Sequence, residues 1–149
     1  SSLAAADPIV ILMKCNQIKM KFLRVAVEFS EKEAPLLSWW YSFSSSIGDS
    51  WVLPCVTEGK YDAPIEVTNT HDFTTSEELV ACLRRTIPVV AFDEAEEDPA
   101  KYWGVASMTL SVLMTAPTQT LSLQLPVLSP NGHTRATLFA EASIASVVH

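Results

Sequence analysis

The residues with the clearest chemical potential in this chain are carboxylates gathered in one short segment. Five acidic residues occupy the six positions 93–98, directly after an apolar run. Grouped carboxylates can bind a divalent cation, attract a basic protein surface, or keep a loop in water. The candidate binding residues are three of these acids and the aromatic pair that follows them: Glu94, Glu96, Glu97, Tyr102 and Trp103.

Catalytic chemistry has much weaker support in the sequence. A nucleophilic mechanism needs a serine or cysteine beside a histidine and a carboxylate. His71 and Asp72 are adjacent, but no pattern brings a particular serine to them. The motifs G-x-S-x-G and H-E-x-x-H and a glycine-rich phosphate loop do not occur, and four glycines leave little material for one. We therefore expect a protein that is not an enzyme.

The cysteines and histidines do not form a metal-binding pattern either. Cys15, Cys55 and Cys82 are far apart and odd in number, whereas disulfide frameworks use even counts and zinc sites use close pairs. The three histidines are scattered as well. We expect no metal and no other cofactor, and we interpret the cysteines as buried free thiols in a reducing cytoplasm.

Length and charge narrow the possible partners. The 149 residues predict a single domain, and because the chain begins at Ser1 without a methionine, we expect it to be a piece of a larger protein. Ten basic and seventeen acidic residues give a net charge of −7. This charge argues against nucleic acid as the main partner and weakly against anionic membranes. No apolar run approaches the roughly 20 residues needed to cross a bilayer.

The acidic segment is expected to connect two strands. Thr75 and Glu78 form a capping pattern that predicts a short helix up to residue 85, with Leu79, Cys82 and Leu83 on one face. Residues 87–92 form a short apolar run typical of a covered strand, and residues 105–110 predict the next strand. The acidic residues between these strands must therefore lie in a solvated loop.

The rest of the chain predicts further strands and few helices. Apolar parity changes between Phe22 and Leu23, so the strand at residues 18–29 should contain a bulge. The aromatic segment WWYSF at residues 39–43 is either core or an exposed binding patch, and it forms a hairpin with residues 51–56. The other predicted elements are strands at residues 9–13, 65–68, 120–125 and 136–144, a polar loop at 58–64, a helical turn at 110–114 and a tight turn at 130–132. About eight strands with one or two short helices predict an all-β, eight-stranded antiparallel β-sandwich.

A characteristic order of motifs covers residues 65–145. It consists of VVAFD at residues 89–93, the acidic loop, YWGVA at 102–106, the alternating strand near 121–125, the Asn131-Gly132 turn and a final strand at 138–144. This order resembles the C-terminal half of a C2 domain. Residues 69–85, ending in ELVACLRR, are similar to the segment that precedes it in C2-like domains of ciliary and centrosomal scaffold proteins, such as the retinitis pigmentosa GTPase regulator-interacting family.

The resemblance also gives an expectation about calcium. Calcium-dependent C2 domains carry a pattern resembling D-x-D-x-x-x-x-x-D in this loop, and Asp93 matches its first aspartate. Ala95 stands where the second belongs, and Lys101 where the third belongs. Calcium requires six to eight oxygen ligands and is repelled by an ammonium group. The resemblance therefore implies a C2-like domain of the calcium-independent type.

Three functions stay open at this point. The first is a protein–protein anchoring module of a cytoplasmic scaffold, for example at a cilium, basal body or centrosome, with tryptophan anchors chosen among Trp39, Trp40, Trp51 and Trp103. The second is a peripheral membrane module that binds acidic phospholipids through Lys14, Lys19 and Lys21. The other interpretation of these lysines is that they protect an outer strand against edge pairing. The third is a jelly-roll or adhesin-like sandwich of unrelated origin, such as a viral coat domain.

Overall fold

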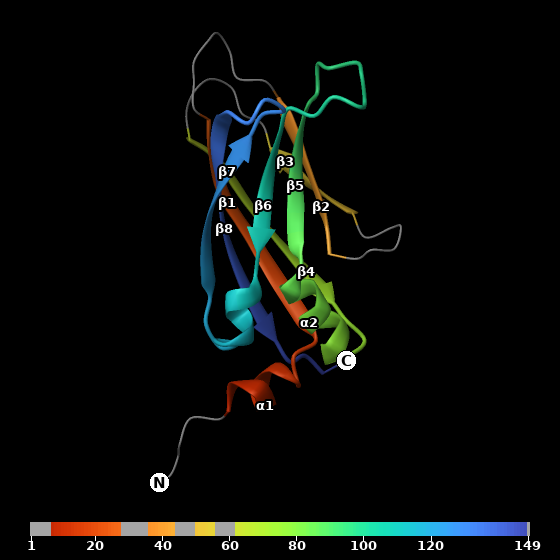
Figure 1. The fold of residues 1–149 in the computed structure, drawn as a ribbon, viewed down its shortest axis with the longest axis vertical. Helices are drawn as coiled ribbons and strands as arrows, with labels where there is room; N and C mark the ends of the chain where they lie inside the picture. Colours follow the sequence, from red (N-terminus) through yellow and green to blue (C-terminus); the bar gives the residue numbers. More distant parts are fainter. Residues whose placement is uncertain (1–6, 28–35, 44–49, 56–61, 149) are drawn as a thin grey trace.

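A computed structural model of the chain describes residues 7–27, 36–43, 50–55 and 62–148, and the side chains of residues 50–63 lie outside what it describes. Within these ranges the chain forms eight strands, two short α-helices and one 3-10 turn (Figure 1). In order they are α1 (Pro8–Leu12), β1 (Gln17–Val27), β2 (Leu37–Ser42), β3 (Ser50–Cys55), β4 (Asp62–Asp72), α2 (Ser76–Arg84), β5 (Thr86–Asp93), β6 (Gly104–Thr109), η1 (Ser111–Met114), β7 (Leu121–Leu128) and β8 (Thr134–Ala145).

The strands form one curled antiparallel sheet with the order β3-β2-β5-β6-β7-β8-β1-β4. Strands β6 and β7 are joined by a single residue pair, Val105 with Leu128, so the sheet divides there into two four-stranded halves. The halves face each other across the core, where the rings of Phe22 on β1 and Tyr41 on β2 lie 5.3 Å apart. The predicted antiparallel β-sandwich is therefore confirmed.

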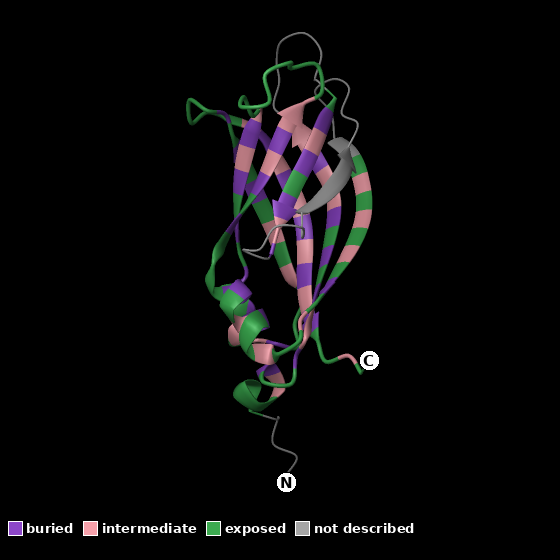
Figure 2. Cartoon of the chain, turned by 90° about the vertical axis from the view of Figure 1, so that its right-hand side faces the viewer, coloured by how far each residue is buried: buried purple, intermediate pink, exposed green. Residues whose placement is uncertain are grey.

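Side-chain alternation places the core between these halves. On β8 every second residue from Ala136 to Ile144 is buried, and on β5 Ile87, Val89 and Ala91 are buried. The same alternation appears as bands of buried and exposed residues along the strands in Figure 2. Because successive residues of a strand point to opposite faces, the other half of each strand forms the outer surface.

The expected bulge lies where the parity of the apolar residues changes. Phe22 pairs with Ala140 and Arg24 with Phe139, so Leu23 is an extra residue on β1 relative to β8. On its other side β1 meets an extra residue of β4, and Glu66 in that segment has a φ of 52°. The bulge allows both halves of β1 to turn their apolar residues inward.

The first predicted strand is wrong. Residues 9–13, predicted to be extended, begin in helix α1 and end in a turn. The Asp7 carboxylate accepts a hydrogen bond from the Ile9 amide at 2.9 Å, and Pro8 occupies the first helical turn. An N-cap aspartate followed by proline favours a helix start, and this local signal overrides the β propensity of the apolar run.

The predicted loop at residues 58–64 and short strand at 65–68 also need correction. Residues 62–64 belong to β4, which runs from Asp62 to Asp72 and pairs with β1 over most of its length. Residues 58–61 lie outside the described ranges. Pro64 is compatible with this strand because β4 stands at the end of the sheet order, so among the described strands it has a neighbour on one edge only.

The remaining local predictions are confirmed where they fall on described residues, whereas residues 28, 29 and 56 lie outside the described ranges. The Thr75 hydroxyl accepts a hydrogen bond from the Glu78 amide at 3.2 Å and caps α2, which buries Leu79, Cys82 and Leu83. Strands β2 and β3 pair as the expected hairpin, although its turn at residues 44–49 lies outside the described ranges. The helical turn appears as η1, and Gly132 adopts a φ of 86° in the turn between β7 and β8.

Candidate functional site

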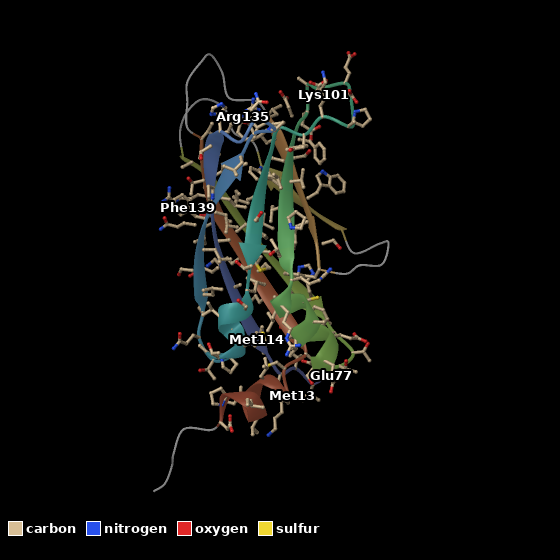
Figure 3. All side chains as sticks on the ribbon, in the orientation of Figure 1. Met13, Glu77, Lys101, Met114, Arg135 and Phe139 are labelled. Atoms are coloured by element: carbon tan, nitrogen blue, oxygen red, sulfur yellow. The ribbon has the colours of Figure 1, made fainter. Side chains whose placement is uncertain are left out.

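The acidic loop, defined here as residues 94–103, joins β5 to β6 at one end of the sandwich. Helices α1 and α2 lie at the other end (Figure 1). Residues 94–102 are all exposed, which confirms the predicted solvated loop. Lys101 in this loop and Arg135 at the start of β8 lie at the same end of the molecule (Figure 3). The exposed residues of the loop are therefore placed at a position where a partner could contact them.

Two consecutive turns shape this loop, and an aspartate opens each of them. The Asp93 carboxylate accepts a hydrogen bond from the Ala95 amide at 2.9 Å, and the Glu96 amide donates to the Asp93 carbonyl at 3.0 Å. The Asp98 carboxylate accepts from the Ala100 amide at 2.9 Å. Aspartate stabilises turns through such contacts to the backbone two residues further on. Part of the acidic composition thus fixes the loop conformation.

Two of the loop positions compared with the calcium-binding pattern carry no carboxylate. Asp93 and Asp98 each bind a backbone amide, and the side chains of Ala95 and Lys101 offer no oxygen ligand. Within the described ranges, no three side chains of histidine, cysteine, aspartate or glutamate converge as a metal site. A calcium ion needs six to eight oxygens. The calcium independence of this loop stays a prediction.

The two aromatic residues after the acids differ: Trp103 is held in place by neighbouring groups, whereas Tyr102 is accessible. The Trp103 amide donates to the Ala91 carbonyl at 2.8 Å, and Arg135 donates from Nη1 to the Trp103 carbonyl at 2.9 Å. The Arg135 guanidinium also lies over the Trp103 ring, 5.2 Å from its centroid. Trp103 is half-buried, whereas Tyr102 is exposed. Tyr102 is therefore the more available contact residue.

A groove of about 650 Å³ lies beside the loop, on the outer face of β2 and β5. Its apolar floor is formed by Trp40, Pro88, Val90 and Phe92. Its rim includes four acids and one base: Asp93, Glu94, Glu96, Asp98 and Lys101. We call this feature the Trp40 groove. Glu97 and Tyr102 belong to the same loop but do not line it.

The other tryptophan candidates have different fates. Trp39 is completely buried and cannot touch a partner, because β2 directs it into the core together with Tyr41. The next residue, Trp40, points outward with 41% of its surface exposed. The aromatic segment is thus mostly core, with one exposed member. The side chain of Trp51 lies outside the described residues.

The three lysines are exposed, but they do not protect a sheet edge. Lys19 and Lys21 project from the outer face of β1, which lies between β8 and β4. The interpretation of β1 as an edge strand is therefore wrong. Lys21 stands opposite Glu141 of β8 in the sheet register, so an acid accompanies this basic pair. Lys14 lies between α1 and β1.

His71, the histidine considered for catalysis, belongs to a buried polar cluster. It lies 2.7 Å from the Tyr41 hydroxyl, which also accepts a hydrogen bond from Asn69 at 3.1 Å. The rings of Phe43 and His71 meet edge to face with centroids 4.6 Å apart. Burial raises the pKa of Tyr41, so its hydroxyl stays protonated at neutral pH. These contacts explain His71 as a residue that holds β4 against β2.

The described cysteines behave as structural thiols. Cys15 and Cys82 are buried and free, and burial raises the pKa of Cys15. The Cys82 thiol donates to the Phe43 carbonyl at 2.9 Å, a carbonyl that Arg85 also contacts. The side chain of Cys55 lies outside the described residues.

Sequence reasoning found the loop but missed the groove and Arg135. The apolar run that contains Pro88, Val90 and Phe92 is typical of a strand covered on both faces. The sequence therefore contains no signal that every second residue of this strand is accessible. Arg135 lies 32 residues from Trp103 in the sequence. The absence of Asp, Glu, Lys and Arg from β2 and β6 could have signalled an apolar outer face.

Solved structures with the same architecture are C2 domains. No protein-family model and no curated protein sequence matches the chain. The first C2 domain of plant Extended Synaptotagmin 1 superposes with a TM-score of 0.64 and 11% identity, covering 90% of this chain and 97% of that one. A C2 domain-containing protein from a putative elicitor-responsive gene gives 0.59 and 11%, covering 96% and 93%. A structure that holds two C2 domains of Extended-Synaptotagmin 2 gives 0.57 and 14%, covering 87% of this chain and 39% of that one.

These similarities define the fold. At 11–14% identity they show that the chain has the C2 fold, as its motif order implied. No helix in the described ranges has the length and apolarity required to span a bilayer. Fold alone does not assign a function, so the site must supply that argument.

Proposed function

We propose that this chain is a non-catalytic, calcium-independent C2-like module that binds a protein partner through its acidic loop. The observation that carries the proposal is the loop itself, in which exposed acids lie next to the exposed ring of Tyr102. The loop also carries Lys101 at a position where calcium-dependent C2 domains have an aspartate. The C2 fold of the chain is compatible with this role, and the exposed loop supplies the argument for it. The mechanism is passive, because a rigid sandwich presents a fixed surface.

The charge of the loop favours a protein over an anionic membrane as the partner at this end of the molecule. Glu94, Glu96 and Glu97 are exposed and outnumber the single base Lys101 in the loop. An acidic loop without a bound cation repels an anionic membrane and attracts a basic protein surface within about 8 Å at physiological salt. Tyr102 beside these acids can supply the apolar contact that such an interface needs.

Calcium independence is tested on the isolated chain. Isothermal titration with calcium is expected to give no binding heat, and sedimentation with phosphatidylserine vesicles should be the same with calcium or with chelator. Because both measurements use the full chain, they also report on acidic residues that lie outside the described ranges. Stoichiometric calcium uptake would overturn this part of the proposal.

The loop's role is tested by proximity labelling in cells, with the chain fused to a biotin ligase. The variant Glu94→Gln/Glu96→Gln/Glu97→Gln removes three charges while it keeps side-chain shape. We expect it to lose proteins with basic surfaces from the labelled set. The control Glu77→Gln/Glu78→Gln neutralises exposed acids on α2, at the other end, and should label like the original. Identical labelling by all three forms would contradict the proposal.

The alternative function is a calcium-independent membrane module that uses Lys14, Lys19 and Lys21. The exposure of Lys19 and Lys21 on one outer face favours it, while Glu141 opposite Lys21 weakens the cationic field. Binding to vesicles of acidic phospholipids that Lys19→Glu/Lys21→Glu abolishes would establish this alternative.

We also propose a cytoplasmic site of action at a cilium, basal body or centrosome. The support is the similarity of residues 69–85 to ciliary and centrosomal scaffold domains. Fluorescently tagged chain expressed in ciliated cells should concentrate at the ciliary base, and an even cytoplasmic signal would contradict this assignment.

A further inference from the structure

We propose that the Trp40 groove binds a peptide segment in which one large apolar side chain is flanked by lysine or arginine. This inference rests on the proposed protein-binding function and names the chemistry of the partner. It also moves the principal anchor from the loop tip to the outer face of the sheet.

The floor of the groove is set by the register of β2 and β5. Trp40 pairs with Val90, and Ser38 pairs with Phe92, so these side chains share one face of the sheet. Pro88 lies two residues before Val90 and therefore on the same face. An apolar strip thus crosses both strands, with Trp40 at its accessible side.

This strip differs from an ordinary solvated sheet face. None of the residues of β2 or β6 is charged, and β5 carries only Asp93 at its last position. Val105 on β6 pairs with Val90 and extends the apolar surface. Exposed aromatic and aliphatic surface of this kind marks an interaction site, and tryptophan is enriched among residues that dominate binding energy.

The rim determines the charge of the ligand. Asp93, Glu94, Glu96 and Asp98 line the groove against one base, Lys101. An apolar ligand residue with a lysine or arginine beside it, on the side of the loop, satisfies the floor and the rim together. A phosphate or an acidic peptide would be repelled by the same carboxylates.

The size of the groove suits a short segment. A volume of about 650 Å³ falls within the roughly 300–1,000 Å³ typical of sites for small ligands, so it accommodates one or two large side chains and not a folded domain. The floor lies on the sheet while the acids lie in the loop above its end. An extended peptide can therefore place its apolar residue on Trp40 and its basic residues toward the loop.

The test is selection from a phage library of random peptides about ten residues long. An extended peptide of this length spans roughly 33 Å. The full 149-residue chain is immobilised. We expect enrichment of sequences with a tryptophan, phenylalanine or leucine next to lysine or arginine. Synthetic versions of the enriched peptides are then measured by fluorescence anisotropy at low and high salt.

Two variants probe the two parts of the groove. Trp40→Ser should weaken peptide binding at least about tenfold, the loss expected of an interfacial tryptophan. Glu94→Gln/Glu96→Gln/Asp98→Asn should weaken it about tenfold at low salt and less at high salt, because ionic attraction is screened. These amides keep oxygens that can accept the loop's backbone hydrogen bonds. Near-ultraviolet circular dichroism checks that both variants are folded.

The controls match each change away from the groove. Val112→Ser removes an exposed apolar side chain from η1, and Glu77→Gln/Glu78→Gln removes exposed acids from α2. Both should bind the selected peptides normally. Loss of binding in these controls equal to that in the groove variants would overturn the proposal.

Each remaining outcome also decides the question. Failure to enrich any sequence, or enrichment of acidic sequences, would overturn the groove's assignment. Peptides that bind equally to the Trp40→Ser variant but not to Glu94→Gln/Glu96→Gln/Glu97→Gln would place binding on the loop alone, leaving the proposed function intact. The calcium and vesicle measurements bear on that function independently of the groove.

Discussion

The two outer faces of the sandwich are built by the same alternation of side chains, yet they have opposite character. The face of β2, β5 and β6 carries Trp40, Val90 and Phe92 and no charged residue before Asp93. The face of β7, β8, β1 and β4 carries Lys19, Lys21, Arg24, Arg135 and Glu141.

The difference between the two faces is seen in the surroundings of one aromatic ring on each. Phe139 on β8 projects outward at the side of the sheet (Figure 3), and the Arg24 guanidinium covers it at 3.7 Å from the ring centroid. Trp40 on β2 is 41% exposed and lines a groove. A ring covered by a cation is already partly desolvated and satisfied, whereas an accessible ring gains free energy when a ligand covers it. The contrast supports the proposed binding at the β2–β5–β6 face.

The largest expected effect separates the two neighbouring tryptophans. Trp39→Ala should lower the free energy of unfolding by about 3–5 kcal/mol, because it leaves a cavity in the core. Trp40→Ala should lower it by only about 1 kcal/mol, because much of that ring is already in water. Urea denaturation of both variants measures the two values. Similar losses would contradict the assignment of these residues to opposite faces.

The next effect concerns Gly104, which precedes the residue pair Val105–Leu128 that joins β6 to β7. A methyl group at Gly104 would meet Val127 Cγ1 at 2.6 Å and the Leu128 carbonyl oxygen at 3.3 Å, and Val127 is fully buried. Gly104→Ala should therefore destabilise the fold by about 1–3 kcal/mol through overpacking. Ser107→Ala, on the exposed side of the same strand, is the control and should stay close to the original. If Gly104→Ala leaves the midpoint of urea unfolding unchanged, β7 moves to accommodate the methyl group and the predicted overpacking is contradicted.

A smaller and opposite effect is expected at the β4 bulge. Glu66 adopts a φ of 52°, a conformation that glycine accepts without the clash of a Cβ atom. Glu66→Gly should raise the free energy of unfolding by about 1 kcal/mol. This value is the backbone strain that the change relieves minus the larger conformational entropy that glycine loses on folding. Glu66→Ala keeps Cβ and removes the same charge, so it should not share the gain. Equal stability of the two variants would rule out backbone strain as the cause.

The smallest effect belongs to the polar face. Lys19→Glu and Lys21→Glu should each change stability by no more than about 0.5 kcal/mol, with the larger loss at Lys21, where the new carboxylate would stand opposite Glu141. Neither should alter peptide binding at the Trp40 groove. A clear loss of peptide affinity in these variants would break the distinction between the faces.

The elements that could be predicted share one property, namely that their signals are local. The alternation in residues 136–144, the Thr75 cap and the glycine turn at Gly132 each depend on a few consecutive residues, and each was predicted correctly. The parity change at Phe22 even located a bulge, because strand periodicity is strict. Residues 9–13 show the limit of the approach, since an apolar run fits either a strand or a short helix until its cap is considered.

The candidate site was predicted only in its local part. The exposed acidic loop follows from its composition, because so many charges cannot be buried. Whether Trp40 or Trp39 faces outward depends on the register with Val90 and Ala91 of β5, some 50 residues away. The contact of Arg135 with Trp103 depends on the return of β8 to the same end of the sandwich.

The amino-acid sequence by itself therefore determined a C2-like sandwich with a solvated acidic loop after a covered strand. Only the tertiary structure decided which tryptophan is available, which ring is covered by an arginine, and that an apolar floor lies beside the acids. The physical reason is that periodicity and charge act over a few residues. A groove, by contrast, is created when strands distant in the sequence align their side chains on one face.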